Sequence, residues 1–145
     1  MLVNHPDVLY KSKTDEWETP QATFDELNQE FGFTLDVCAS STNHKCEKYF
    51  TIEDDGLKQS WLGETVWCNP PYSDIATWVK KAYEETRFPG TTVVMLIPAR
   101  TSTKYFHNYI IHRTEIRFVK GRLKFGGKDN APFSNMIVIF RGPGV

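Results

Sequence analysis

The chain has 145 residues, of which 40% are hydrophobic and 24% charged, the composition of an ordinary globular protein with one core. No apolar run approaches the roughly 18 residues that span a bilayer, and the amino terminus has neither the basic start nor the apolar stretch of a signal peptide. Three cysteines, an odd number, argue against a disulfide framework and fit a reducing cytoplasm. We therefore expect a single cytoplasmic domain over residues 1–145, with no membrane partner.

The net charge of −1 hides an asymmetry between the two parts of the chain. From Pro98 onward there are nine Lys or Arg residues and two Asp or Glu residues, so this part carries +7 and the first 97 residues carry −8. A basic half indicates an anionic partner such as nucleic acid. Uneven surface charge between two parts of one sheet would give the same count.

The first predicted element after an extended arm at residues 1–18 is a helix that ends near Phe31. Thr19 is a suitable N-cap and Pro20 a suitable first helical residue. Apolar residues then recur at helical spacing, and Gly32 is a typical residue just past a helix end.

Strands and helices are predicted to alternate along the rest of the chain, which indicates an α/β sheet. The run at 91–97, TTVVMLI, is almost uniformly apolar, as expected of a central parallel strand buried on both faces. The other predicted elements are, in order, a strand at 33–38, a polar loop at 39–45, a short strand at 47–51, a turn at 54–56, a strand at 64–68, a helix from about 73 to 87, a helix near 105–110, a strand at 116–119, a hairpin arm at 123–125 and a strand at 136–140.

The stretch CNPPYS at 68–73 stands between a strand and a helix, where two prolines form a rigid corner without backbone donors. A planar amine conjugated to a ring is a poor nucleophile, and a site helps it by accepting hydrogen bonds from both N–H groups. The side-chain oxygen of Asn69 and the backbone carbonyl of Pro70 are suitable acceptors. Pro71 restricts the residue before it to extended geometry, and the ring of Tyr72 offers a face for a stacked base. A plain strand-to-helix turn with a packed tyrosine is the alternative.

The sequence resembles the phage-type DNA adenine-N6 methyltransferases, which use S-adenosylmethionine. The pieces that carry the resemblance are WETP (17–20), LDVCAS (35–40), KYFTIEDDGL (48–57), WCNPPYSDIATWVKKA (67–82), LIPARTSTKYFH (96–107), GRLKF (121–125) and NAPFSN (130–135). The resemblance implies a Rossmann-like class I methyltransferase sheet with a C-terminal antiparallel hairpin. It also implies a phage or prophage enzyme that methylates flipped adenines in double-stranded DNA in the bacterial cytoplasm.

Residue by residue, the resemblance makes Asn69, Pro70, Pro71 and Tyr72 the catalytic tetrad. It places seven residues around the cofactor. Thr19, Pro20 and Asp36 would lie near the methionine end and Asp55 would read the adenine amino group, and the weaker candidates are Trp17, Ser40 and Phe50.

Several of these residues have a structural alternative. Asp36 could cap a turn, Asp55 could form an Asx-turn, and Trp17 could pin the arm to the core. Cys38, His44 and Cys46 lie close in sequence, but they lack paired metal-ligand spacing, so we expect no metal site.

Two features depart from the family pattern. The loop at 38–44 contains no glycine, and only 32 residues separate Asp36 from Asn69, so the sheet must be trimmed there and no residue presents itself as the ribose-binding acid. No separate target-recognition domain is visible. Sequence reading would then fall to loops, to the basic region 98–128 or to a second subunit in a homodimer. The candidate phosphate contacts are Arg100, Lys104 and Arg122.

Other readings stay open at this point. Phe133, within NAPFSN, fits either a wall of the base pocket or the core. The same chemistry could act on cytosine N4, on RNA adenine or on a protein glutamine. The short segment and the missing glycines also fit a nucleic-acid-binding module that descends from a methyltransferase and no longer catalyses.

Overall fold

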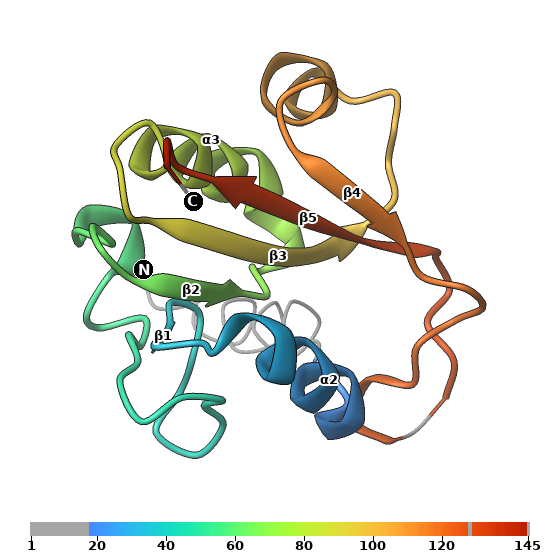
Figure 1. Cartoon of the computed structure of the whole chain (residues 1–145). Coiled ribbons are helices and arrows are strands. Elements are labelled where there is room, and N and C mark those ends of the chain that lie inside the picture. Colours follow the sequence, from blue (N-terminus) through green and yellow to red (C-terminus); the bar gives the residue numbers. More distant parts are fainter. Residues whose placement is uncertain (1–17, 128, 145) are drawn as a thin grey trace, which may run out of the picture.

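The computed structural model describes residues 18–127 and 129–144, which form a mixed α/β fold around one five-stranded sheet (Figure 1). The strand order is β1-β2-β3-β5-β4. Strands β1 (Leu35–Asp36), β2 (Thr65–Cys68) and β3 (Thr92–Pro98) are parallel neighbours. Strand β5 (Asn135–Arg141) lies antiparallel to β3, and β4 (Glu115–Phe118) lies antiparallel to β5 at the edge. The carboxyl ends of the three parallel strands therefore meet at one edge of the sheet.

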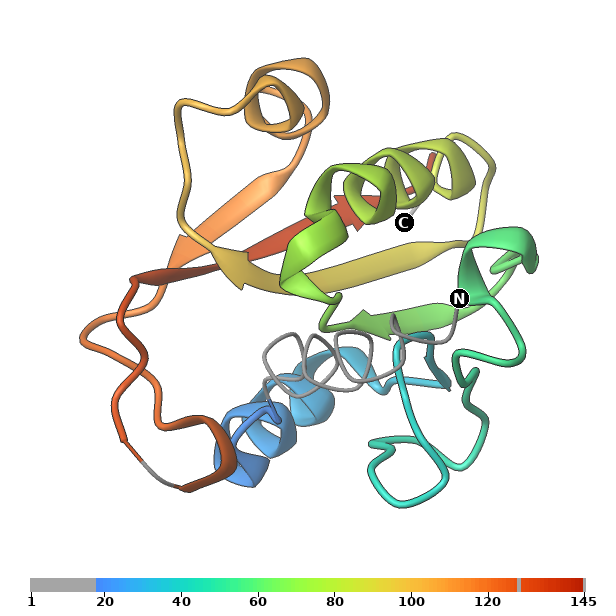
Figure 2. The same cartoon turned by 180° about the vertical axis from the view of Figure 1, so that it is seen from behind.

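Helices cover both faces of the sheet (Figures 1 and 2). Helix α2 (Gln21–Phe31) lies on one face, while α3 (Ile75–Glu85) and a π-helical turn (Phe106–Ile110) lie on the other. The regular structure of residues 18–127 and 129–144 also includes three short 3-10 turns, at Gly56–Lys58, Tyr72–Asp74 and Phe125–Gly127.

The core divides into two clusters because successive side chains of a strand point to opposite faces. All seven residues of β3 are buried. Met95 packs with Val79 on the α3 side, and Val94 packs with Phe24 on the α2 side. Each such side chain contributes about 1.5–3 kcal/mol when it is fully buried, so β3 contributes strongly to the stability of both layers.

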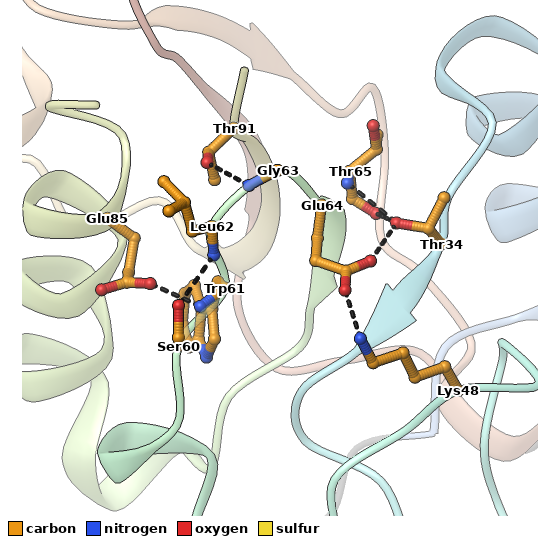
Figure 3. Close-up of polar contacts among 10 residues, drawn as sticks. All are labelled: Thr34, Lys48, Ser60, Trp61, Leu62, Gly63, Glu64, Thr65, Glu85 and Thr91. Carbon is orange, nitrogen blue, oxygen red and sulfur yellow. Dashed lines mark hydrogen bonds and ion pairs between the residues drawn. The ribbon is translucent and has the colours of Figure 1, made fainter. Parts of the chain in front are cut away.

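A polar network joins the amino-terminal ends of the parallel strands, as Figure 3 shows. Glu64 forms an ion pair with Lys48 and accepts a 2.8 Å hydrogen bond from Thr34 Oγ1. Gly63 N donates to Thr91 Oγ1 at 2.9 Å. Burial alone would raise the pKa of Glu64, but the hydrogen bonds from Lys48 and Thr34 and the charge of Lys48 hold that pKa below its ordinary value.

The predicted start of the first helix was wrong by one residue. The helix begins at Gln21 with Pro20 as its N-cap, and no side chain caps it. Thr19 does not cap the helix, because its Oγ1 accepts a hydrogen bond from the side chain of Asn69. The predicted stop at Gly32 is confirmed: this residue has φ 68°, which glycine adopts without strain.

Three further predictions of local structure need correction. Residues 47–51 do not form a strand, because only Tyr49 forms an isolated parallel bridge, with Asp36. The predicted helix near 105–110 is a π-helical turn. The predicted arm at 123–125 is not a strand either, since Ala131 N and Leu123 O pair within a long loop at 119–134.

The C-terminal antiparallel pair itself is confirmed, because β4 and β5 are neighbours over four residue pairs. The loop at 119–134 that joins them begins where β4 ends and returns at Asn135, opposite Pro98 at the carboxyl end of β3. It therefore emerges at the same edge of the sheet as the ends of the parallel strands. No helix in the described residues is both long and apolar enough to cross a membrane.

Candidate active site at the carboxyl edge of the sheet

The corner predicted from CNPPYS follows directly after β2. Pro71 has φ −62° and ψ 132° and precedes the 3-10 turn that begins at Tyr72, and α3 starts at Ile75. The two prolines end the strand because they cannot donate to a ladder, and the chain then turns away from the sheet. The corner therefore stands at the edge where ligands of parallel α/β sheets bind.

A cavity of about 260 Å³ opens beside this corner. Its wall is formed by the loop after β1, by the turn that precedes and includes the first 3-10 helix, and by the corner itself; these parts are 37–40, 51–57, Asn69 and Pro71. The volume is near the lower end of the range for small-molecule sites. The cavity therefore connects the tip of the first strand with Asn69.

The lining of the cavity is acidic on its polar side and aromatic on one wall. Glu18, Asp55 and Asp74 line it, and among the described lining residues there is no lysine or arginine. Trp78 supplies the aromatic wall and lies 6.1 Å, centroid to centroid, from Trp61, with the rings stacked. A cationic ligand suits such a lining, because both carboxylates and aromatic faces attract positive charge.

Gly56 fixes how this wall packs. Its carbonyl accepts a 2.9 Å hydrogen bond from Nε1 of Trp61. A Cβ placed on Gly56 would lie 2.7 Å from the carbonyl oxygen of Val37 and 3.1 Å from Cη2 of Trp78, closer than side chains tolerate. Glycine is needed here because the turn approaches the loop after β1 backbone against backbone.

Asn69 is held from the start of α2. Its Nδ2 donates to Thr19 Oγ1 at 2.9 Å, and Thr19 is only 3% exposed. Among the described residues that line the cavity are Asn69 and Glu18, but not Thr19 or Pro20.

Tyr72 lies on the far side of the corner within an aromatic group. Its ring makes edge contacts with Phe133 at 5.3 Å and with Phe125 at 6.5 Å between centroids. Asn135 Nδ2 lies 3.5 Å from its hydroxyl oxygen. Burial raises the pKa of Tyr72, against the opposing effects of Asn135 and of the nearby positive charge of Arg100, so the phenol is neutral at physiological pH.

Asp36 ends β1, as predicted, but its carboxylate is turned to the backbone. It accepts hydrogen bonds from Cys38 N at 3.2 Å and from Lys45 N at 2.8 Å, and it is 3% exposed. Burial raises the pKa of this carboxyl, while the two backbone hydrogen bonds and the charge of Lys45 oppose the shift. Asp36 thus organises the loop that lines the cavity, and is not itself among the described lining residues.

The two neighbouring acids of the turn, Asp54 and Asp55, have different surroundings. Asp54 accepts hydrogen bonds from the backbone and the hydroxyl of Thr51, as a turn-forming residue does. Asp55 has φ 55° and lines the cavity, with Lys58 3.8 Å away. Asp54 therefore holds the turn through Thr51, three residues earlier, whereas Asp55 contributes to the wall of the cavity.

The remaining predicted residues are placed as follows. Ser40 lines the cavity. Phe50 packs against the core beside α3, and its backbone pairs with Asp36 and Ala39. Trp17 and the rest of the arm before Glu18 lie outside the described residues.

The predicted phosphate contacts are exposed and basic. Arg100 and Lys104 follow the carboxyl end of β3, and the charge of Arg100 acts on both Tyr72 and Tyr105. Arg122 lies in the loop at 119–134, where its guanidinium donates to Ala131 O at 3.3 Å. Arg100 and Arg122 therefore belong to segments that begin at the edge of the sheet where the corner stands.

The lining residues that sequence reasoning missed include Glu18, Asp74 and Trp78. Glu18 stands inside WETP, next to two residues that were chosen, and its carbonyl accepts from Gly126 N at 3.0 Å. Asp74 follows the corner by two residues and also lines the cavity. Trp78 was assigned only to the apolar stripe of its helix, because periodicity reports burial and not what a ring faces. In the described part of the chain no group of three His, Cys, Asp or Glu side chains is placed to hold a metal ion.

Taken by its geometry, the chain is an α/β protein with a ligand cavity at the carboxyl edge of a parallel sheet and an Asn-Pro-Pro-Tyr corner between that cavity and an aromatic group. Comparison with known proteins places it more closely. The family described as DNA N-6-adenine-methyltransferase (Dam) matches residues 7–141, so the chain belongs to this family.

Three curated relatives illustrate the similarity. A DNA N-6-adenine-methyltransferase of Haemophilus phage HP1 is 36% identical over 111 residues, which is 75% of this chain and 64% of that protein. A DNA N-6-adenine-methyltransferase of Escherichia phage T1 is 35% identical over 122 residues, 83% of this chain and 49% of that protein. The putative methyltransferase YfdM of Escherichia coli is 37% identical over 78 residues, 49% of this chain and 86% of that protein. The chain thus spans about half to two thirds of the two phage proteins.

Proposed function

We propose that this protein transfers the methyl group of S-adenosylmethionine to the exocyclic N6 amine of adenine in DNA. The observation that carries the proposal is the position of the corner: Asn69 and Pro71 line the cavity, while Tyr72 belongs to the aromatic group beyond it. A transfer between two ligands needs such a shared wall. The family membership and the printed names of the phage relatives support the same reaction.

The cavity suits S-adenosylmethionine as its occupant. When bound, this cofactor supplies a methyl group on a positively charged sulfonium, whose transfer leaves a neutral thioether. Asp55 and Ser40 both line the cavity; Asp55 would accept from the adenine amino group, and Ser40 would offer a hydroxyl from the loop after β1. The carboxylates and the indole of Trp78 favour the cationic part of the cofactor.

The target adenine would stack on Tyr72 after it is flipped out of the duplex. A base stacked on an aromatic ring gains roughly 1–3 kcal/mol, which offsets part of the cost of unstacking it from the helix. The ring centroid of Phe133 lies 5.3 Å from that of Tyr72, with the rings edge to face, and Phe133 would form a side wall of the base pocket.

Asn69 and Pro70 would activate the amine. The side-chain oxygen of Asn69 and the carbonyl of Pro70 each accept one N–H, which turns the nitrogen lone pair toward the methyl carbon. The nitrogen would form its bond to that carbon as the carbon–sulfur bond breaks, and the sulfur would keep the electron pair. The nitrogen then loses one proton to water. We assign this proton to water because burial raises the pKa of Tyr72 and keeps its phenol protonated. Much of the rate gain comes from positioning.

Duplex DNA would lie along the basic segments at this edge. Arg100, Lys104 and Arg122 are exposed and would contact phosphates, which gives affinity without sequence information. The loop at 119–134 and a second copy of the chain are the two sources of sequence reading that we consider. Light scattering with and without DNA distinguishes them, because a homodimer doubles the mass.

The sheet fits a class I methyltransferase fold that has been trimmed after the first strand. In the described residues, the segment between β1 and β2 contains one 3-10 turn and no further strand of the sheet. Its turn still closes the cavity through Asp55 and Gly56. We propose that the protein is encoded by a phage or prophage and acts in the bacterial cytoplasm, in line with its phage relatives.

The test is methyl incorporation from labelled S-adenosylmethionine into plasmid DNA, followed by digestion to nucleosides and mass analysis. We expect label in N6-methyladenine. Asn69→Ala should abolish transfer while the cofactor Kd, measured by calorimetry, stays within a few-fold. Label in cytosine, in RNA or in protein would move the activity to another amine. DNA binding without cofactor binding would identify an inactive nucleic-acid-binding module.

A further inference from the structure

Thr19 and Asn69 are 50 positions apart in sequence but are joined by one side-chain hydrogen bond. The amide nitrogen of Asn69 donates to Thr19 Oγ1 at 2.9 Å, and Thr19 is 3% exposed. This hydrogen bond restrains both side chains, because Thr19 is almost fully buried and solvent competes little for its hydroxyl, while Asn69 is half-buried.

We propose that Thr19 is a positioning residue for methyl transfer, which holds the side-chain amide of Asn69 so that its oxygen accepts from the target amine. This inference rests on the proposed function. It assigns Thr19 a task different from the cofactor contact implied by the family resemblance. Among the described residues that line the cavity Thr19 does not occur, although its neighbour Glu18 does.

The reason lies in the two unlike ends of an amide. One end accepts and the other donates, and only the accepting end can bind the N–H of an amine. When the oxygen of Asn69 faces the amine, the NH2 group faces away from it and needs an acceptor inside the protein. Thr19 Oγ1 supplies that acceptor.

The backbone around Thr19 is itself well held. Pro20 follows it as the N-cap of α2, with φ −55°, and the carbonyl of Glu18 accepts from Gly126 N at 3.0 Å. Asn69 is therefore anchored to the start of a helix and, through Glu18, to the loop at 119–134. A flexible side chain from the surface could not set the amide as firmly.

The first test compares Thr19→Val, which removes the acceptor at nearly constant volume, with Thr19→Ser, which retains it. We expect Thr19→Val to lower the single-turnover rate of methyl transfer about tenfold, the effect of one lost hydrogen bond to a buried group. The cofactor Kd should stay within about threefold. Thr19→Ser should restore the rate to within about threefold of the natural protein. Thermal unfolding checks that each variant is folded, and Thr19→Ala replaces Thr19→Val if valine prevents folding.

The second test observes the amide directly by NMR. The Asn69 side-chain NH2 signals are assigned by their loss in Asn69→Ala. Their exchange with solvent should be slow in the natural protein and in Thr19→Ser, and at least fivefold faster in Thr19→Val. A purely structural role of Thr19 would lower the melting temperature without selectively exposing these protons.

The outcomes separate the two proposals. If the natural protein methylates DNA and Thr19→Val transfers at the same rate, the positioning role is overturned and the function stands. A Thr19→Val variant that loses cofactor affinity in proportion to its rate also overturns it, in favour of a direct cofactor contact. If the natural protein transfers no methyl group to any substrate, the proposed function fails and the positioning role fails with it.

Discussion

Substitution of Gly56 by alanine tests whether the cofactor binds in this cavity more sharply than a change of any charged lining residue does. The added Cβ would lie 2.7 Å from the carbonyl oxygen of Val37, whereas ordinary contacts begin at 3.4 Å, so one of the two backbones must move by more than half an ångström. Overpacking of this kind costs roughly 1–3 kcal/mol in the free energy of unfolding. For a domain of this size each kcal/mol lowers Tm by about 2–4 °C, which gives a fall of roughly 2–12 °C.

The same displacement should weaken cofactor binding. Gly56 joins Asp55 to the wall that faces Val37, and all three residues line the cavity. A shift of more than half an ångström in either wall misplaces polar groups that face the cavity. We expect the Kd for S-adenosylmethionine, measured by calorimetry at a temperature where the variant is folded, to rise about tenfold or more, equivalent to about 1.4 kcal/mol.

Gly142→Ala is the matched control. Its Cβ would lie 2.4 Å from the carbonyl oxygen of Phe88 and 3.0 Å from that of Thr91, so it is overpacked against backbone in the same way. Gly142 follows β5 at the opposite edge of the sheet, far along the strand from the corner. Gly142→Ala should lower Tm but leave the cofactor Kd within about twofold. Equal affinity of the two variants for the cofactor would refute the placement of the cofactor in this cavity.

The other predictions concern the base, the DNA and the amino edge of the sheet. Tyr72→Ala should weaken binding of a flipped base by roughly 1–3 kcal/mol, while Tyr72→Phe should retain most of it, as read from 2-aminopurine fluorescence in place of the target adenine. Arg100→Ala, Lys104→Ala and Arg122→Ala should each reduce the slope of log K against log salt for DNA binding by about 0.9, whereas Arg141→Ala, paired with Glu115 at the opposite edge, should not change it. Glu64→Gln should lower stability at pH 7 by at most about 1 kcal/mol, because Lys48 is 57% exposed and solvent screens the pair. Since the pKa of Glu64 is lowered from 4.5, this contribution is present above pH 4.5 and is lost as the pH falls through the folded value, so urea unfolding of the two proteins should coincide in acid below the folded pKa.

The parts of the fold that the sequence predicts are those where the pattern is local. The strand expected at 91–97 is β3, because seven apolar or β-branched residues in a row have no polar face to turn to solvent. The helix after the corner also follows its stripe, with Ile75, Trp78 and Val79 buried. The corner could be placed because proline removes donors wherever it stands.

The parts that could not be predicted depend on contacts distant in sequence. Thr19 stands where an N-cap is expected, but its hydroxyl oxygen accepts a hydrogen bond from Asn69, which is 50 positions away. The sequence predicts a hairpin arm at 123–125 about Gly121. Instead, the loop at 119–134 is held by the hydrogen bond from Gly126 N to the carbonyl of Glu18, more than a hundred positions earlier. Propensity reports what a segment does alone, and these two segments take their shape from partners in other elements.

The segment between the first two strands decides between an enzyme and an inactive relative, because its shortness and its missing glycines were the arguments for inactivity. Its loop needs no glycine, since the buried carboxylate of Asp36 binds the backbone of Cys38 and of Lys45 and so fixes the chain where it turns. The segment is short, but Gly56 allows its turn to pack directly against the backbone of Val37. The turn therefore occupies the place of a longer crossover. Both devices leave the cavity open between the first strand and Asn69. Cofactor titration separates the two, because binding of S-adenosylmethionine favours the enzyme and DNA binding without it favours the inactive relative.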